Sequence, residues 1–185
     1  MTESFNALNK KLGGGEKPTD WHQHANGGGW VHKSASVDES AYVSEAAIVW
    51  GEVFGDARVF GNAQVFGDAQ VFGDAQVFGD AQVFGNAQVF GDAQVFGDAQ
   101  VFGNAQVFGN AQVFGDAWEK SPLFIIGSTY SLTNAKHGYI QIGCECHPFE
   151  WWLKNGKALA VKNGFTKEQI AEYAAYVKLF IKVGK

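Results

Sequence analysis

The residues of this chain best suited to bind a metal are Cys144, Cys146 and His147, with His137 nearby. Thiolates and imidazoles are the usual ligands of structural zinc. However, the spacing Cys-x-Cys-His matches neither a zinc finger nor a zinc ribbon, and a second pair of cysteines is missing. Two cysteines on one strand are more typical of small core residues. We therefore expect no metal site and no cofactor.

Histidines that could act as a general base are absent from the middle of the sequence. No His occurs between His32 and His137, and His22 and His24 lie in a Gly-rich segment where we expect no metal either. Group transfer needs a base within hydrogen-bond distance of the substrate. Apart from Arg58, the regular repeats at 57–116 offer only Gln, Asp, Asn and Phe at their polar or bulky positions, with no Ser or Cys nucleophile. The sequence thus predicts a protein that is not an enzyme.

The composition indicates a folded chain of one domain with an appendage. Of its 185 residues, 46% are apolar and 18% are charged, which is outside the range of disordered chains. No run of 18 apolar residues occurs, so we expect no membrane span and no membrane partner. The first eleven residues lack the apolar core of a secretory signal, and two cysteines are too few to staple a secreted scaffold. These features predict a cytoplasmic location.

Charge is divided unevenly along the chain. Residues 31–117 hold two basic and eleven acidic residues, a net charge of −9. Residues 118–185 hold nine lysines and five glutamates, a net charge of +4. An acidic middle is thus followed by a basic end, which bears on the partners that each part would attract.

An internal repeat of six residues dominates the middle of the chain. From Ala57 to Asp116 the pattern Ala-x-Val-Phe-Gly-Asp/Asn occurs ten times, and x is Gln or Arg. Four looser copies precede this run, followed by a copy two residues short at 53–56. The first four positions alternate as a strand does, so Ala and Val should point inward and x and Phe outward. Gly-Asx then predicts a corner, because both residues tolerate a positive φ. Identical faces must keep turning the same way, and three faces close a triangular coil of 18 residues.

This repeat resembles the hexapeptide-repeat proteins, in which an aliphatic residue is followed four positions later by a small one. Val59 with Ala63 and Val65 with Ala69 match that pattern, and the resemblance covers residues 29–117. It implies a left-handed parallel β-helix, here a mainly β triangular solenoid of about five coils. The sequence differs from the common pattern by placing Phe after the aliphatic residue. The family includes CoA-dependent acyltransferases, which use a His on the β-helix, but no His occurs in this sequence between His32 and His137.

Two flanking segments complete the predicted organisation. Residues 1–28 are Gly-rich and are predicted to form a flexible leader. Residues 118–185 are predicted to form a small α+β module with strands at 122–126 and 138–146 and helices at 149–162 and 166–182. Thr166 followed by Gln169 indicates a capping box at the start of the last helix.

The tail of this module is loosely similar to tails of small phage- or prophage-encoded hexapeptide proteins. The residues that carry the similarity are Ile140, Ile142, Gly143, Cys144, His147, Trp151, Trp152 and the segment 164–166. The similarity names no activity.

Two kinds of residue are candidates for partner binding, and both recur at the 18-residue spacing. Outward Phe residues should stack into ladders, and several Phe on one face form an apolar patch of the size that marks interfaces. Asp residues should line up along the corners, either to ease the turn or to form an acidic surface. The candidate residues are Phe60, Phe78, Phe96 and Phe114, and the acidic residues Asp56, Asp74, Asp92, Asp80, Asp98 and Asp116.

These features favour a non-catalytic, acidic solenoid that acts as a structural or oligomeric scaffold. We expect protein partners, including a second or third copy of the chain, and no direct contact with nucleic acid. An alternative is an inhibitor that imitates nucleic acid and occupies the groove of a basic host DNA-binding or defence protein. A CoA-dependent acyltransferase is a third alternative that rests on the fold alone.

Overall fold

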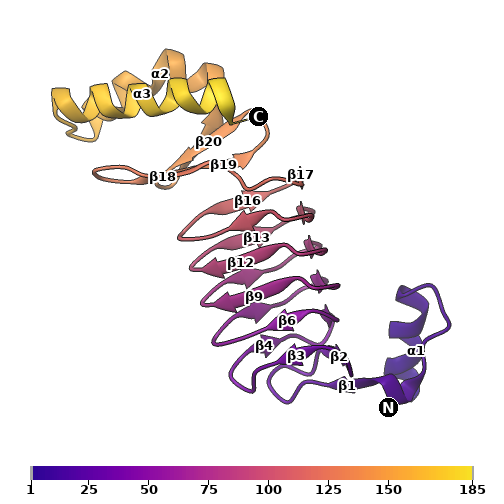
Figure 1. Ribbon diagram of the computed structural model, residues 1–185. Coiled ribbons are helices and arrows are strands. Elements are labelled where there is room, and N and C mark those ends of the chain that lie inside the picture. Colours follow the sequence, from indigo (N-terminus) through magenta and orange to yellow (C-terminus); the bar gives the residue numbers. More distant parts are fainter. Residues whose placement is uncertain (1, 185) are drawn as a thin grey trace.

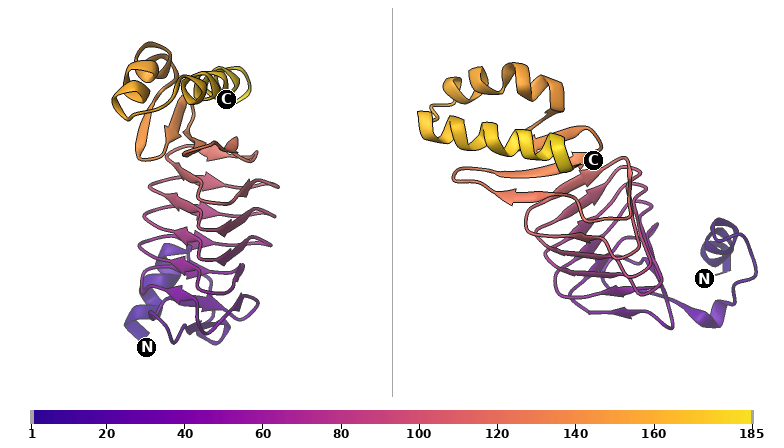
Figure 2. Two further views of the ribbon diagram at one scale, coloured as in Figure 1. Left: turned by 90° about the vertical axis from the view of Figure 1, so that its left-hand side faces the viewer. Right: turned by 45° about the horizontal axis from the view of Figure 1, so that its top comes forward.

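The computed structural model describes residues 2–184 and consists of a rod of stacked coils that carries a small sheet and two helices at one end (Figure 1). The rod is a parallel β-solenoid of about five turns, so the predicted mainly β solenoid with an α+β C-terminal module is confirmed. Seen from two other directions, the coils remain stacked along one axis, and helix α1 (Thr2–Lys11) lies beside the rod rather than across its end (Figure 2).

Three sheets form the sides of the rod. The first face contains β1 (Trp21–Gln23), β2 (Trp30–His32), β5 (Ile48–Val49), β8 (Gln64–Val65), β11 (Gln82–Val83), β14 (Gln100–Val101) and β17 (Ala117–Trp118). The second face contains β3 (Ser36–Val37), β6 (Glu52–Val53), β9 (Gln70–Gly73), β12 (Gln88–Gly91) and β15 (Gln106–Val107). The third face contains β4 (Tyr42–Val43), β7 (Arg58–Val59), β10 (Gln76–Val77), β13 (Gln94–Phe96) and β16 (Gln112–Phe114).

The register of the regular coils follows the repeat. Gln76 pairs with Gln94, eighteen residues later, and the neighbouring faces repeat the same offset. All Ala and Val residues from Ala57 to Val113 are fully buried, whereas Gln and Phe face outward. The predicted inward and outward positions are therefore confirmed. The core is a column of small and β-branched side chains, and each buried Val contributes about 1.5–3 kcal/mol.

The position of the short repeat differs from the prediction, which placed it at residues 53–56. Glu52 pairs with Ser36, sixteen residues earlier, and with Gln70, eighteen residues later. Glu52 thus occupies the position of the repeat's glutamine, and Gly51 before it stands in the place of Ala. The two missing residues belong to the corner that precedes Gly51. The sequence pattern could not reveal this, because Gly51 looks like a corner residue.

The corners depend on glycine alone. Each corner glycine from Gly55 to Gly115 has a positive φ, and within residues 2–184 no other residue type does. The expectation that Asp and Asn share this conformation was wrong. The glycines also stack closely, because a Cβ on Gly79 would lie 2.9 Å from the carbonyl oxygen of Gly97 in the next coil.

Regular structure extends into residues 1–28, for which the sequence indicated a flexible leader. Helix α1 is followed by a 3₁₀ turn at Pro18–Asp20 and by β1, which pairs antiparallel with β2. Phe5 and Leu8 of α1 pack on Trp30 and Ile48, two apolar residues that stand outward where the repeat has Gln. The helix is amphipathic, and its apolar side covers the two coils in which the first face carries a large apolar residue at this position.

The C-terminal module is a four-stranded antiparallel sheet covered by two helices on the side away from the rod (Figure 1). Its strands are β18 (Phe124–Ile126), β19 (Ser131–Lys136), β20 (Tyr139–Ile142) and β21 (Glu145–Pro148). The single strand predicted at 138–146 is thus two strands, and β19 was not predicted. Helices α2 (Phe149–Lys162) and α3 (Lys167–Val183) lie where the sequence indicated, and Thr166 and Gln169 form the predicted capping box. Within residues 2–184 no helix is long and apolar enough to cross a bilayer.

We predict that Gly79→Ala lowers the free energy of unfolding more than Gly97→Ala does. Both glycines have a positive φ, which costs alanine about 1–2 kcal/mol. A Cβ at residue 79 also meets the next coil, which raises its total to about 2–4 kcal/mol, whereas at residue 97 the nearest atom is 3.8 Å away. Chemical unfolding of both variants measures the difference. Equal losses would show that close stacking of the corners contributes nothing.

Candidate functional site

Stacked phenylalanines run along all three faces of the rod, as the repeat predicts. On the third face, the ring centroids of Phe60, Phe78, Phe96 and Phe114 are 4.8, 5.1 and 5.2 Å apart in succession. The first face carries a similar ladder of Phe66, Phe84 and Phe102. The rings are nearly parallel and partly exposed, so each shields its neighbour's face and leaves its outer edge free.

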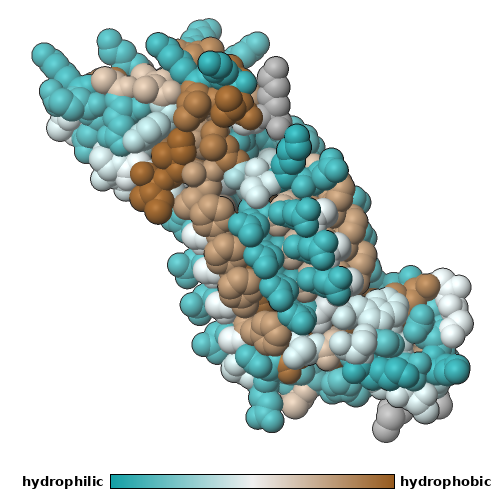
Figure 3. All heavy atoms as spheres, in the orientation of Figure 1, coloured by the Kyte–Doolittle hydropathy of each residue, from teal (hydrophilic) through white to brown (hydrophobic). Residues whose placement is uncertain are grey.

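The ladder on the second face continues beyond the rod. Phe72, Phe90 and Phe108 stack at 4.9 and 5.5 Å, and Phe124 of the C-terminal module packs edge-on against Phe108 at 5.6 Å. Ile126, two residues farther along β18, is 79% exposed. We call these five residues the aromatic stripe. Figure 3 shows it as a continuous apolar band that runs from the rod onto the module.

Polar side chains border the aromatic stripe on both sides. On one side, Gln106 donates to Gln88, Gln88 to Gln70, and Gln70 to Glu52, with distances of 3.0, 3.0 and 2.6 Å. The other side is the corner edge that carries Asp56, Asp74 and Asp92. An apolar strip with a polar rim has the composition of many protein interfaces.

The remaining acidic candidates lie along the corner edge of the third face. Asp80, Asp98 and Asp116 occupy successive coils above Asn62. Two of the three have structural partners, because Asp80 accepts a hydrogen bond from the Asn62 amide at 3.0 Å and Asp116 accepts one from the backbone N–H of His137 at 2.7 Å. This edge is therefore both an acidic line and part of the corner structure.

Cys146 and His147 belong to β21, and Cys144 directly precedes that strand. His147 stacks on Trp151 with ring centroids 3.6 Å apart, and its Nε2 forms a hydrogen bond with a carboxylate oxygen of Glu145 at 2.9 Å. Cys144 is exposed, whereas Cys146 is half-buried, and its burial raises the pKa of the Cys146 thiol. Among residues 2–184 no three His, Cys, Asp or Glu side chains gather closely enough to hold a metal ion.

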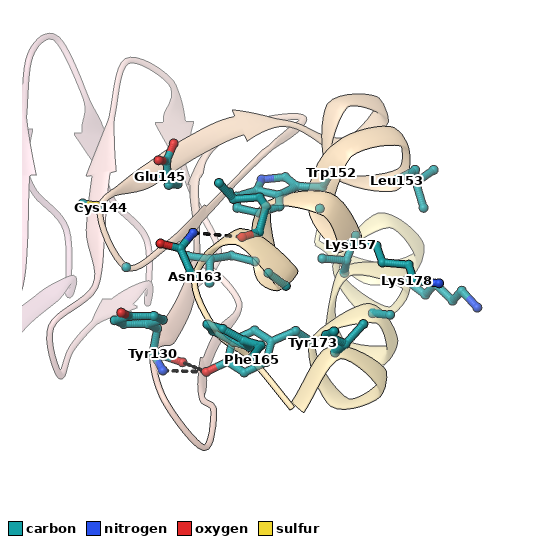
Figure 4. A pocket seen from close by; sticks show the side chains of 18 residues that line it. Tyr130, Cys144, Glu145, Trp152, Leu153, Lys157, Asn163, Phe165, Tyr173 and Lys178 are labelled. Atoms are coloured by element: carbon teal, nitrogen blue, oxygen red, sulfur yellow. Dashed lines mark hydrogen bonds between the residues drawn. The ribbon is translucent and has the colours of Figure 1, made fainter. Parts of the chain in front are cut away.

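A cleft in the C-terminal module was missed by the sequence analysis. It has a volume of 260 Å³ and lies between α2, α3 and the turn that joins β20 to β21 (Figure 4). Trp152, Phe165 and Tyr173 are prominent in its walls. The one signal in the sequence is Leu153, an apolar residue that follows the buried Trp152 on α2. In the structure Leu153 lines the cleft and is 60% exposed. Periodicity alone could not distinguish such a rim from a buried helix face.

Comparison with known proteins finds no matching protein-family model, no similar curated protein and no similar solved structure. The β-solenoid itself agrees with a β-helix repeat family. The left-handed sense of the coil and the similarity of the tail to phage proteins remain predictions from the sequence.

We predict that the two thiols react at different rates with a disulfide reagent. Cys144 is exposed, whereas burial hinders access to Cys146 and raises its pKa, so less of it is the reactive thiolate at neutral pH. The time course should show a fast and a slow phase. Cys144→Ser should remove the fast phase, Cys146→Ser the slow one, and a higher pH should speed the slow phase. A single phase in the wild type would contradict the described burial.

Proposed function

We propose that this protein is a non-catalytic scaffold that associates side by side with a second copy through the aromatic stripe. The observation that carries the proposal is an apolar strip, continuous over the rod and the module, that nothing in residues 2–184 covers. Apolar surface of this extent on a water-exposed protein favours burial against another surface.

The way in which α1 covers the apolar part of the first face supports the proposal that the stripe is also covered. Where apolar residues replace the outward Gln, at Trp30 and Ile48, the chain supplies its own cover in Phe5 and Leu8 of α1. The stripe has no such internal cover in the described chain, although Ile126 is among the most exposed large apolar residues. A partner surface would serve the stripe as α1 serves the first face.

The distribution of charge favours an antiparallel pair. The rod segment 31–117 carries a net charge of −9 and the segment 118–185 a net charge of +4. Two copies that lie in opposite directions bring each basic module beside the acidic rod of the other, whereas parallel copies place like charges together. Complementary charge of this kind sets orientation more than affinity.

We predict that Phe72→Ser combined with Phe90→Ser weakens self-association at least tenfold. Removing buried aromatic side chains from the centre of an interface typically costs more than about 1 kcal/mol each. The matched control is Phe78→Ser with Phe96→Ser, which removes an equal stack from the third face. Light scattering over a range of concentrations measures the mass. The proposal fails if the wild type is monomeric at about 100 µM, where even weak pairs associate.

A second candidate function is imitation of nucleic acid by the acidic edges. It is favoured by the succession of Asp80, Asp98 and Asp116 at one edge, one per coil. Five coils at a strand spacing of about 4.8 Å give a rod of about 24 Å, or one net charge per about 2.7 Å. B-DNA carries one charge per about 1.7 Å, so the rod has roughly 60% of that density.

We predict for this candidate that changing Asp80, Asp98 and Asp116 to Asn preserves the fold, because Asn already stands at residue 62 of the same edge. Binding to a basic DNA-binding partner should weaken, and its dependence on salt should flatten, because fewer charges are paired. The measurement immobilises the wild type and the triple variant, applies a cell lysate, and compares the amounts of bound protein that added duplex DNA releases. Retention unchanged by the triple variant would remove the acidic edge from function.

A further inference from the structure

The cleft of the C-terminal module has the character of a small ligand site that is separate from the aromatic stripe. Its walls come from both helices and from the sheet, and they are mostly apolar: Trp152, Leu159, Phe165, Tyr173 and Val177. Figure 4 shows the aromatic rings facing the hollow from different elements. Such concave, largely apolar sites are where small molecules usually bind.

The polar atoms of the buried aromatic side chains Trp152 and Tyr173 in the cleft wall are already engaged within the protein. The indole N–H of Trp152 donates to the carbonyl of Ile140 at 2.8 Å. The hydroxyl of Tyr173 donates to the carbonyl of Tyr130 at 2.8 Å, and the side-chain amide of Asn163 donates to a carbonyl of α2 at 2.9 Å. Asn163 keeps one amide N–H, but this residue is exposed. Trp152 and Tyr173, which are buried, offer no free donor to a ligand. A sugar or nucleobase buried here would lose hydrogen bonds with water that these groups cannot replace.

The free charges at the cleft are positive. Lys157 of α2 and Lys178 of α3 line it, and both are exposed. Within the described residues neither lysine forms an ion pair. The one carboxylate in the lining is Glu145, which is paired with His147 at 2.9 Å. In Figure 4 the lysines lie on the helical wall, with the Lys178 side chain extending outward from it, and Glu145 lies on the opposite wall. The cleft therefore combines an apolar interior with two available cations on one side.

We propose that this cleft binds a free fatty acid of medium chain length, with the chain between the helices and the carboxylate near Lys157 and Lys178. A water molecule occupies about 30 Å³ in the liquid, and a methylene group is of similar size, so a volume of 260 Å³ holds a chain of about eight carbons. The proposal does not depend on self-association, because the lining includes none of the five residues of the stripe.

The first experiment titrates the full-length protein with fatty acids of six, eight, ten and twelve carbons, below their micelle concentrations, and follows tryptophan fluorescence. Affinity should rise about fourfold per added methylene while the chain fits, and should level off near eight to ten carbons. The alcohols of equal length should bind more weakly. The absence of saturable binding, or equal affinity of acid and alcohol, would overturn the proposal.

Matched variants locate the site. Ala174 and Ala175 are adjacent and exposed on α3, but only Ala174 lines the cleft. Ala174→Trp should abolish fatty-acid binding. Ala175→Trp should leave the affinity within about twofold of the wild type, because residue 175 is not part of the cleft lining. Equal binding by both variants would contradict the assigned cleft.

A charge variant tests the position of the carboxylate independently of the packing variants. Lys157→Gln with Lys178→Gln should weaken the ten-carbon acid about tenfold, the sum of two exposed ion pairs, and should not affect the alcohol. The control is Lys154→Gln with Lys162→Gln, because both of these lysines lie on α2 but outside the lining of the cleft. Equal losses of affinity for the acid and the alcohol would contradict the proposal. It would also be contradicted if the protein cosedimented with anionic vesicles but did not bind the free acid saturably.

Discussion

The structure depends on the backbone hydrogen bonds that join each coil to the next. The N–H of Gln76 donates to the carbonyl of Ala93 and that of Phe78 to the carbonyl of Val95, both at 2.9 Å. Because this register repeats, a residue always lies over its own counterpart in the neighbouring coil. Phe therefore stacks on Phe, Gln bonds to Gln and glycine packs on glycine, so the ladders, the amide chain and the tight corners all have one cause.

Stacked coils leave unpaired strand edges at both ends, and the irregular parts of the chain occupy those positions. At the start, β1 pairs with β2 in the opposite direction, and the N–H of Gly29 donates to the carbonyl of Val43. At the other end, β19 packs on β16, and Trp118 closes the core in the place of a valine. A repeat cannot cover its own ends, so these segments must differ from it in sequence.

The sequence predicted the elements whose pattern is local. It failed for elements whose structure depends on tertiary contacts. Alternation in the repeat and the capping box of Thr166 specify their structures without help from distant residues. Strand β19 has no apolar alternation, since it is held by buried polar groups: Asn134 donates to the carbonyl of Gly184 at 2.6 Å and accepts from the N–H of Leu123 at 3.2 Å. The stripe was predictable as a Phe ladder, but its continuation through Phe124 and the cleft in the module required the docked arrangement of the segments.

The triangular cross-section also fixes how the length of this rod could change during evolution. An insertion of one six-residue unit would add a single face and turn the C-terminal module by a third of a revolution relative to α1. An insertion of eighteen residues would add a whole coil and move the module along the axis with its orientation unchanged. Only insertions of three repeat units or a multiple of three therefore preserve the rotational orientation of the C-terminal module relative to α1.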